Sequence, residues 1–369
     1  MGDTVEVVAE RLLQVIDEGR RTATYKLALL LALMDACAAQ ADADGLAPSE
    51  LHTRVIAHHV LYLPQAREYL AGDGDPLQLR QITNRRSTFF SEVLRLHFLA
   101  ARHRCRTIDE IARHLPEDYE RCLDEVERTF ARYPLRLLQV VGREQRPFLY
   151  DVDWGESVSL TSLHVEGGGW IRFRPEAGDQ LLRLAPLLRP LIELHWTRMV
   201  AKFNAINIED ERLSEHLFGA DRVPFPKLLR EGLADMQRGA CFYCGDRLVG
   251  RAQVDHFIPW SRWPNNAIEN LVLADGCNGL KSDYLPAFRH VDRWARRFVG
   301  QAGDLASVAE EARWESDPHR TLGLTRSCFA HVPTGTPLWL QAEEFTEDDP
   351  GLISARLADL PSGKPPVPR

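Results

Sequence analysis

Apolar residues recur at spacings of three and four positions through most of the first 135 residues. This spacing puts them on one face of a helix with 3.6 residues per turn, so it predicts amphipathic helices. Prolines and glycines punctuate the sequence between these stretches, as expected for helix ends and turns. The stretches with this pattern are residues 8–16, 26–38, 50–63, 89–100, 108–115 and 123–130.

The pattern changes between residues 136 and 175, where short apolar runs are bounded by turn-forming residues. Such runs are typical of short strands. The expected strands are residues 137–141, 148–152, 157–163 and 170–173. Helical spacing returns over residues 181–206 and again after residue 300. The chain as a whole therefore predicts an α+β protein with a mostly α-helical N-terminal region and a small β-containing middle.

Length and composition place the chain among folded proteins. Its 369 residues are enough for two or three domains, and 44% hydrophobic with 27% charged residues is ordinary for a globular protein. The longest apolar run, residues 27–34, is too short to cross a bilayer, so no membrane association is expected. The N-terminus lacks the order of a secretion signal, which favours a cytoplasmic protein.

Charge and cysteine content narrow the candidate chemistry. A net charge of −8 argues against a surface coated in positive charge, but it allows a local basic face such as the one that Arg293 and Arg297 would form. A reducing compartment disfavours disulfides among the seven cysteines. Cys241 and Cys244 are the clustered pair, so we interpret them first as metal ligands.

The sequence Cys241-Phe-Tyr-Cys244-Gly has the form of a zinc knuckle. Two thiolates on a tight turn can occupy two corners of a Zn²⁺ tetrahedron, and the glycine relieves the turn. Beyond it, residues 247–249 and 253–256 are expected to form a hairpin around Gly250. That hairpin would deliver Asp255 and His256 side by side at the end of a strand.

Two asparagines follow this pair. Asn270 opens a strand-like apolar run, and Asn278 lies at the start of a short helix that continues through Lys281. Carboxylate and carboxamide oxygens suit Mg²⁺ or Mn²⁺, and a neutral imidazole can deprotonate water near neutral pH. The helix N-terminus and Lys281 would favour a nearby phosphate.

At these residues the sequence resembles the HNH (ββα-metal) endonuclease family, whose fold is a β-hairpin, a loop and a helix around one metal. The resemblance implies that Asp255 and Asn278 bind Mg²⁺ and that His256 is the general base. It implies that Asn270 braces the loop that carries His256. The motif is similar to the HNH domain of RNA-guided CRISPR effectors, but the rest of the chain shows no resemblance to them.

Many HNH proteins carry a second cysteine pair that completes a four-cysteine zinc site. Here that pair is reduced to Cys277, with Asp275 near the place of the missing cysteine. Zinc bound to Cys241, Cys244 and Cys277 would need Asp275, a histidine such as His290, or water as its fourth ligand. The alternative is a knuckle without zinc, in which the cysteines pack.

These patterns lead to four expected regions. They are a helical recognition or regulatory domain (1–135), a mixed β-hairpin and helical connecting region (136–225), an HNH nuclease domain (226–300) and a C-terminal extension with a disordered tail (301–369). Lys281, Arg293 and Arg297 are the candidate substrate contacts.

The expected reaction is metal-dependent hydrolysis of DNA phosphodiester bonds, plausible in bacterial restriction or anti-phage defence by analogy with modules fused to sensor domains. A homodimer or a defence-system protein is a possible partner. The motif equally allows an enzyme that cleaves RNA. A third hypothesis is a catalytically inactive zinc-knuckle module that binds nucleic acid or protein, although a pure binder would not need Asp255, His256 and Asn278 together.

Overall fold

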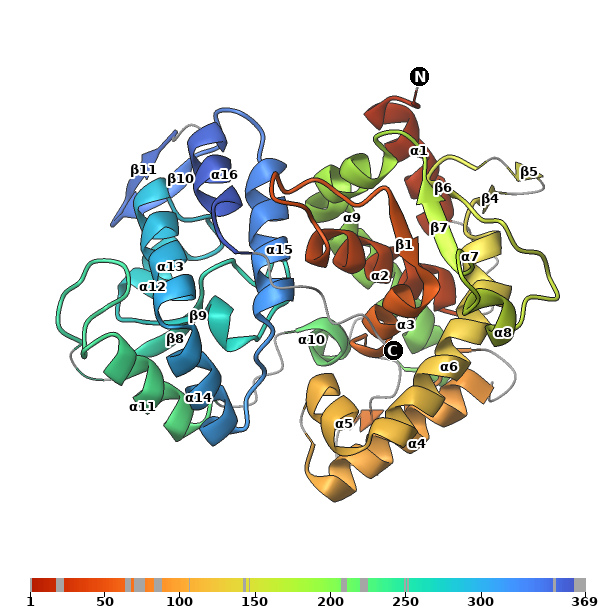
Figure 1. The fold of residues 1–369 in the computed structure, drawn as a ribbon, viewed down its shortest axis with the longest axis horizontal. Coiled ribbons are helices and arrows are strands. Elements are labelled where there is room, and N and C mark those ends of the chain that lie inside the picture. Colours follow the sequence, from red (N-terminus) through yellow and green to blue (C-terminus); the bar gives the residue numbers. More distant parts are fainter. Residues whose placement is uncertain are drawn as a thin grey trace. The chain divides into compact units, whose positions relative to one another are not determined.

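The helical spacing of the N-terminal region is realised mostly as helices in the computed structural model (Figure 1). The helix expected over residues 50–63 is wrong at its start, where residues 50–52 form a strand that pairs with residues 170–172. The structure describes residues 2–17, 23–63, 68–69, 77–82, 88–105, 107–141, 144–145, 147–206, 211–219, 225–248, 250, 252–347 and 350–361. Contacts group the described residues into two units, residues 2–37 with 48–219 and residues 38–47 with 225–361.

The first unit is mainly helical. The apolar face of each helix is buried, as in α6, whose residues Leu123, Val126 and Phe130 lie inside while its charged residues lie mostly outside. The helices are α1 (Val5–Asp17), α2 (Tyr25–Ala39, whose last two residues group with the second unit), α3 (Thr53–Leu61), α4 (Thr88–His103), α5 (Ile108–His114), α6 (Pro116–Arg132), α7 (Pro134–Leu137), α8 (Leu160–Leu163), α9 (Ala177–Asn204) and α10 (Glu211–Phe218).

Short antiparallel strands accompany these helices. A three-stranded sheet has the order β1-β7-β6 and pairs Leu51 with Ile171 and Tyr150 with Phe173. Two further pairs are β2 with β3 and β4 with β5. The strands are β1 (Glu50–His52), β2 (Glu68–Tyr69), β3 (Leu77–Gln78), β4 (Val140–Val141), β5 (Glu144–Gln145), β6 (Tyr150–Asp151) and β7 (Trp170–Phe173).

The strand prediction for the middle region is confirmed in part. The strand expected over residues 170–173 is β7, and two other expected strands are reduced to the two-residue β4 and β6. The strand expected over residues 157–163 is wrong, because its second half is helix α8. Ser159 caps this helix by accepting from the backbone N–H of Ser162, whose hydroxyl receives the N–H of Ser159.

The second unit contains the HNH motif. Its helices are α11 (Lys227–Met236), the 3₁₀ turn η1 (Ile268–Asn270), α12 (Cys277–Lys281), α13 (Phe288–Gly300), α14 (Ala302–Ala312), α15 (Pro318–Ala330) and α16 (Pro350–Ala358). Its strands are β8 (Gln253–His256), β9 (Leu271–Ala274), β10 (Leu338–Gln341) and β11 (Glu344–Thr346). The pairs β8 with β9 and β10 with β11 are antiparallel.

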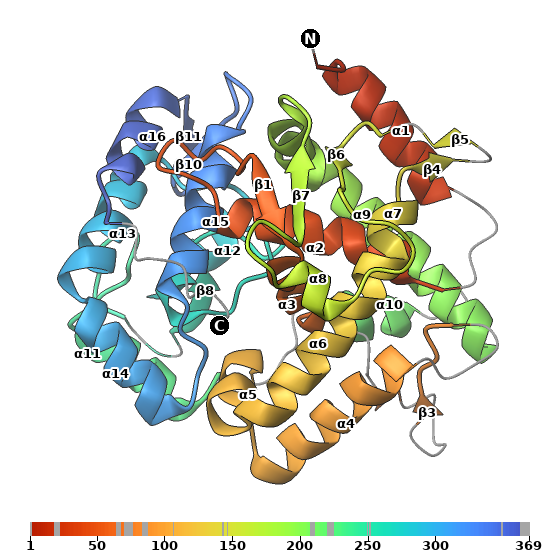
Figure 2. The same ribbon diagram turned by 45° about the vertical axis from the view of Figure 1, so that its right-hand side comes forward.

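Strand β9 lies at the centre of this unit, and all four of its residues are buried. Leu271 and Leu273 pack against Leu229 and Leu233 of α11 and against Leu305 of α14. Figures 1 and 2 show α11 and α14 side by side next to this strand pair. Strand β8 is therefore held in place by a buried neighbour along its whole length.

This pairing corrects the hairpin that we expected between residues 247–249 and 253–256. Strand β8 takes β9 as its partner, while Arg247 forms a bridge with Ala240 (Val249 lies outside the described residues). The knuckle closes on itself through the N–H groups of Cys241, which donates to the Asp246 carbonyl, and of Leu248, which donates to the Gly239 carbonyl. Strand β8 thus bonds its backbone to β9, and the knuckle bonds its backbone groups within residues 239–248.

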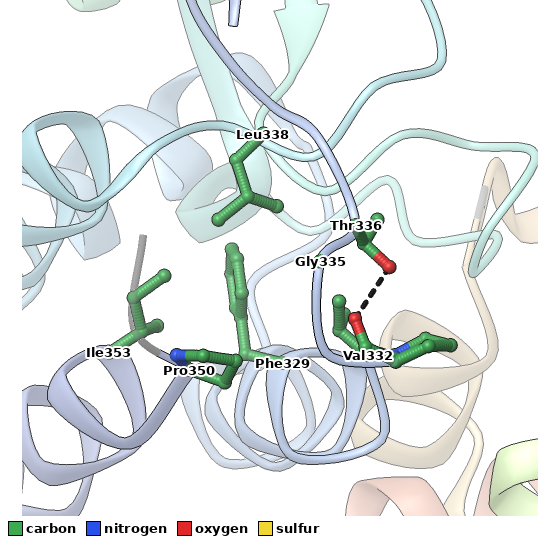
Figure 3. A pocket seen from close by; sticks show the side chains of 8 residues that line it. Phe329, Val332, Gly335, Thr336, Leu338, Pro350 and Ile353 are labelled. Carbon is green, nitrogen blue, oxygen red and sulfur yellow. Dashed lines mark hydrogen bonds between the residues drawn. The ribbon is translucent and has the colours of Figure 1, made fainter. Parts of the chain in front are cut away.

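A small apolar pocket in the second unit is lined by α15, the loop after it, β10 and the start of α16 (Figure 3). Phe329, Leu338 and Ile353 supply its apolar walls, and the Thr336 hydroxyl donates to the Pro333 carbonyl at its edge. The pocket contains none of the candidate site residues, so the fold does not connect it with the chemistry of the HNH motif.

The structure confirms an α+β chain with a helical N-terminal region and small antiparallel sheets. Within the described ranges, no helix combines the length and the apolar character that crossing a bilayer requires. The disordered tail that we expected after Pro361 lies outside the described residues.

Candidate active site and metal centre

Strand β8 ends in Asp255 and His256, whose side chains leave the strand on opposite faces. His256 pairs with Leu271 across the sheet and therefore shares the face that packs against α11 and α14. Asp255 pairs with Val272 and shares the other face. The chain leaves the strand directly after His256, so the two residues lie at the end of a strand, as the sequence predicted.

The carboxylate of Asp255 is buried, with 8% of the residue exposed. The hydroxyl of Tyr243 donates to its Oδ2 at 2.5 Å, and the ammonium of Lys281 lies 3.3 Å from the same oxygen. Neither contact involves Oδ1. Burial raises the pKa of Asp255, and Lys281 and Tyr243 oppose this rise by stabilising the charged form.

The imidazole of His256 is half-buried and contacts the rings of Phe225 and Trp260. Its Nε2 lies 2.9 Å from Oδ1 of Asn266. Because an amide oxygen only accepts hydrogen bonds, Nε2 is the nitrogen that carries the hydrogen in the neutral ring, and Nδ1 keeps its lone pair. Burial lowers the pKa of His256, although the bond to Asn266 works in the opposite direction. The lowered pKa keeps the ring neutral and able to accept a proton.

Asn270 is completely buried and braces the loop that follows β8. Its Oδ1 accepts from the N–H of Ile258 at 2.8 Å, and its Nδ2 donates to the carbonyls of Ile258 and Asn265. One carboxamide thus joins both ends of the loop from residue 258 to residue 265. We therefore keep the bracing of this loop as the proposed role of Asn270.

Asn278 lies in the first turn of α12 and is half-buried. Its Nδ2 donates to Oε1 of Gln253 at 2.8 Å. Gln253 and Asp255 are two positions apart in β8, so they share one face of the strand. The side chain of Asn278 therefore lies on the Asp255 side of the strand, and its Oδ1 is not the atom used in this bond.

The three candidate substrate contacts have partners inside the domain. Lys281 has no exposed surface, and it donates to the Ser282 carbonyl besides facing Asp255. Arg293 donates to the carbonyls of Phe242 and Tyr243. Buried Arg297 donates to the carbonyls of Leu271 and Glu269. This placement favours roles inside the domain over contacts to phosphate for all three.

Four side chains of the knuckle region converge in a way that fits a metal ion. The Sγ atoms of Cys241, Cys244 and Cys277 and a carboxylate oxygen of Asp275 all lie within 4.8 Å of one another. Three thiolates and one carboxylate form a donor set that zinc accepts. Gly245, with a φ of 84°, allows the turn after Cys244, as its position in the motif predicted.

Among the possible fourth ligands, Asp275 lies in this cluster, whereas Nε2 of His290 lies 2.7 Å from the Leu340 carbonyl. Burial raises the pKa values of Cys244 and Cys277 in the absence of a cation. A bound cation would reverse this effect by stabilising the thiolates.

Two residues of this region were missed by the sequence reasoning. Tyr243 occupies a variable position inside the Cys-x-x-Cys motif, where spacing assigns no function. Asn266 stands in a Pro-Asn-Asn segment that the sequence indicates only as a turn. No periodicity connects either residue with Asp255 or His256, because both contacts depend on how separate loops fold back onto β8.

Comparison with known families divides the chain in two. Residues 6–217 match the family described as domain of unknown function (DUF8808). Residues 241–287 match the family described as HNH endonuclease. This range includes the candidate active-site residues Asp255, His256, Asn270 and Asn278. Neither the curated proteins nor the solved structures offered a match to the chain. The resemblance stated from the motif is therefore confirmed, and the chain carries an HNH domain after its helical N-terminal region.

Proposed function

We propose that this chain, which belongs to the family with the domain of unknown function DUF8808, is a metal-dependent HNH endonuclease that hydrolyses DNA. The observation that carries the proposal is the arrangement around β8. Among the described residues, the contacts of the Asp255 carboxylate use Oδ2, and Asn278 lies on the same side of the strand. His256 ends the strand with Nδ1 available as a base.

In this proposal each residue has a separate role. Asp255 and Asn278 hold Mg²⁺ or Mn²⁺ through oxygen atoms, which are the ligands that these cations prefer. The cation would stabilise the charge that develops on the phosphate and on the leaving oxygen. His256 takes a proton through Nδ1 from the water that attacks phosphorus, as the bond between phosphorus and the leaving oxygen breaks.

The supporting residues keep these groups in place. Asn266 holds Nε2 of His256, and Asn270 joins the two ends of the loop between them. Such fixed hydrogen bonds limit the reorganisation that the reaction requires. Phosphate contacts through Lys281, Arg293 and Arg297 are not part of the proposal, because their donors face groups of the protein.

Cleavage of supercoiled plasmid tests this function directly. With Mg²⁺ or Mn²⁺ the wild-type protein is expected to nick or linearise the plasmid, and EDTA is expected to stop the reaction. Parallel reactions with single-stranded DNA and with RNA separate a DNA enzyme from an RNA enzyme. If none of these substrates is cut with either metal, the HNH domain is a binding module and the proposal fails.

We also propose that the knuckle holds structural zinc through Cys241, Cys244, Cys277 and Asp275. Metal analysis of the purified protein is expected to find about one zinc per chain, consistent with a closed four-ligand site. Replacing Cys241 and Cys244 by serine should abolish this zinc, whereas Cys105→Ser, in the other unit, should not. Wild-type protein without zinc would mean that the cysteines merely pack.

We place the enzyme in the cytoplasm, in bacterial restriction or defence against phage. The support is the combination of an HNH domain with a larger helical region of separate family. In this proposal the helical unit recognises substrate, signal or a partner, and the HNH domain supplies the cleavage.

A further inference from the structure

The side chain of Tyr243 joins the knuckle to the candidate catalytic carboxylate. Tyr243 stands between Cys241 and Cys244, and its hydroxyl donates to Oδ2 of Asp255 at 2.5 Å. The two residues are 12 positions apart and belong to different elements, the knuckle turn and strand β8. This hydrogen bond connects the knuckle turn directly to the carboxylate.

Tyr243 is fixed at both ends. Its ring is completely buried and packs edge to face against Phe242, His290 and Trp339, with ring centroids 5.2–5.3 Å apart. Its backbone carbonyl accepts from the guanidinium of Arg293 on α13. Such packing leaves the ring one position, so the hydroxyl has a defined place beside β8.

The second donor to Asp255 is also tied to the knuckle. Lys281 lies four residues after Cys277 in α12, which places the two side chains on the same side of the helix. Its ammonium lies 3.3 Å from Oδ2, the oxygen that Tyr243 also contacts. The Cys241–Cys244 turn and the helix that begins at Cys277 thus each supply one donor to Oδ2 of Asp255.

We propose that Tyr243 is a positioning residue that couples the cysteine cluster to catalytic metal binding by holding Oδ2 of Asp255 so that Oδ1 serves the metal. This inference rests on the proposed function, because it takes Asp255 to be a metal ligand. A carboxylate whose one oxygen accepts from the protein keeps the lone pairs of the other for a cation. Residues that orient a ligand in this way set metal affinity without touching the metal.

Titration calorimetry with Mn²⁺ on the full chain, without nucleic acid, tests the coupling. Tyr243→Phe keeps the ring and removes the hydroxyl, and it is expected to weaken Mn²⁺ binding about 10- to 100-fold. In the cleavage assay the same variant should need a correspondingly higher Mn²⁺ concentration for half-maximal rate, while its rate at saturating Mn²⁺ changes little. Its zinc content should equal that of the wild type.

Tyr284→Phe is the matched control, because Tyr284 lies in the same unit but is 45% exposed. It should bind Mn²⁺ as the wild type does. If Tyr243→Phe also binds Mn²⁺ with wild-type affinity, Tyr243 is a packing residue and the inference is overturned. Asp255→Asn tests the metal site of the proposed function itself. If that variant binds Mn²⁺ like the wild type, Asp255 is not a metal ligand, and both the proposed metal site and the coupling are wrong.

Discussion

Replacing His256 by alanine is expected to lower the rate of metal-dependent cleavage by about 10²- to 10⁴-fold, the usual contribution of a general base. The imidazole ends β8 with Nε2 held by Asn266, and Nδ1 is the nitrogen left to accept a proton. Alanine removes this acceptor and leaves the pairing of β8 with β9 intact. Single-turnover cleavage of a labelled DNA at saturating Mn²⁺ measures the loss.

His319→Ala is the matched control for this experiment. His319 is also a half-buried histidine of the second unit, and burial lowers its pKa as it does for His256. It should cleave like the wild type. Cleavage that persists undiminished in His256→Ala would show that another group activates the water.

The pH dependence of the wild-type rate gives a second readout of the same assignment. The neutral imidazole is the active form, and burial lowers the pKa of His256 from its ordinary value of 6.5. A lowered pKa keeps the neutral form populated in more acidic solution. As the pH is lowered, the rate should therefore stay level past pH 6.5 and fall only in more acidic solution. An acidic limb that begins well above this value would contradict the role of a buried His256.

Replacing Lys281 by methionine is expected to lower the free energy of unfolding by about 3 kcal/mol, because it breaks a buried ion pair and leaves one partner behind. Lys281 is fully buried beside Asp255, which is 8% exposed. Burial raises the pKa of Asp255 and lowers the pKa of Lys281, and their mutual attraction opposes both shifts. Methionine fills a similar volume but removes the cation, so the carboxyl keeps Tyr243 as its remaining donor.

Urea unfolding without added Mg²⁺ or Mn²⁺ measures this loss, with Lys227→Met as the control. Lys227 pairs with Glu231 on the surface of α11 with 87% of its side chain exposed, so its replacement should change stability by no more than about 0.5 kcal/mol. A Lys281→Met variant with unchanged stability but weaker, less salt-dependent DNA binding would instead indicate the phosphate contact that the sequence suggested.

The candidate chemistry could be identified from the sequence because it depends on residue types at short spacing. Asp255 and His256 are neighbours, Asn270 and Asn278 follow within one small motif, and Cys241 and Cys244 lie on one turn. The motif carries enough ordered elements to predict an HNH domain, which the family match over residues 241–287 confirms. Helical spacing likewise predicted the helices of the N-terminal region, since a buried helix face repeats along a local stretch of chain.

Long-range partners could not be predicted in this way. The sequence favoured residues 247–249 as the partner of β8, but β9 takes that place because its four buried residues need a neighbour that satisfies their backbone. Residues 157–163 were expected to be a strand, and the side chain of Ser159 capped a helix there instead. In both cases local apolar character predicted a strand pairing that the structure does not form.

By itself, then, the sequence determined the helical character of the N-terminal region, the HNH motif and its candidate metal ligands, because each depends on periodicity or on residues close together in the chain. The tertiary structure alone decided that Lys281 faces Asp255, that Asn266 holds His256 and that Tyr243 joins the knuckle to the carboxylate. These contacts connect residues from 10 to 26 positions apart across separate elements. They arise when the knuckle turn, the loop after β8 and helix α12 pack against the end of β8, and no spacing rule within the chain encodes that packing.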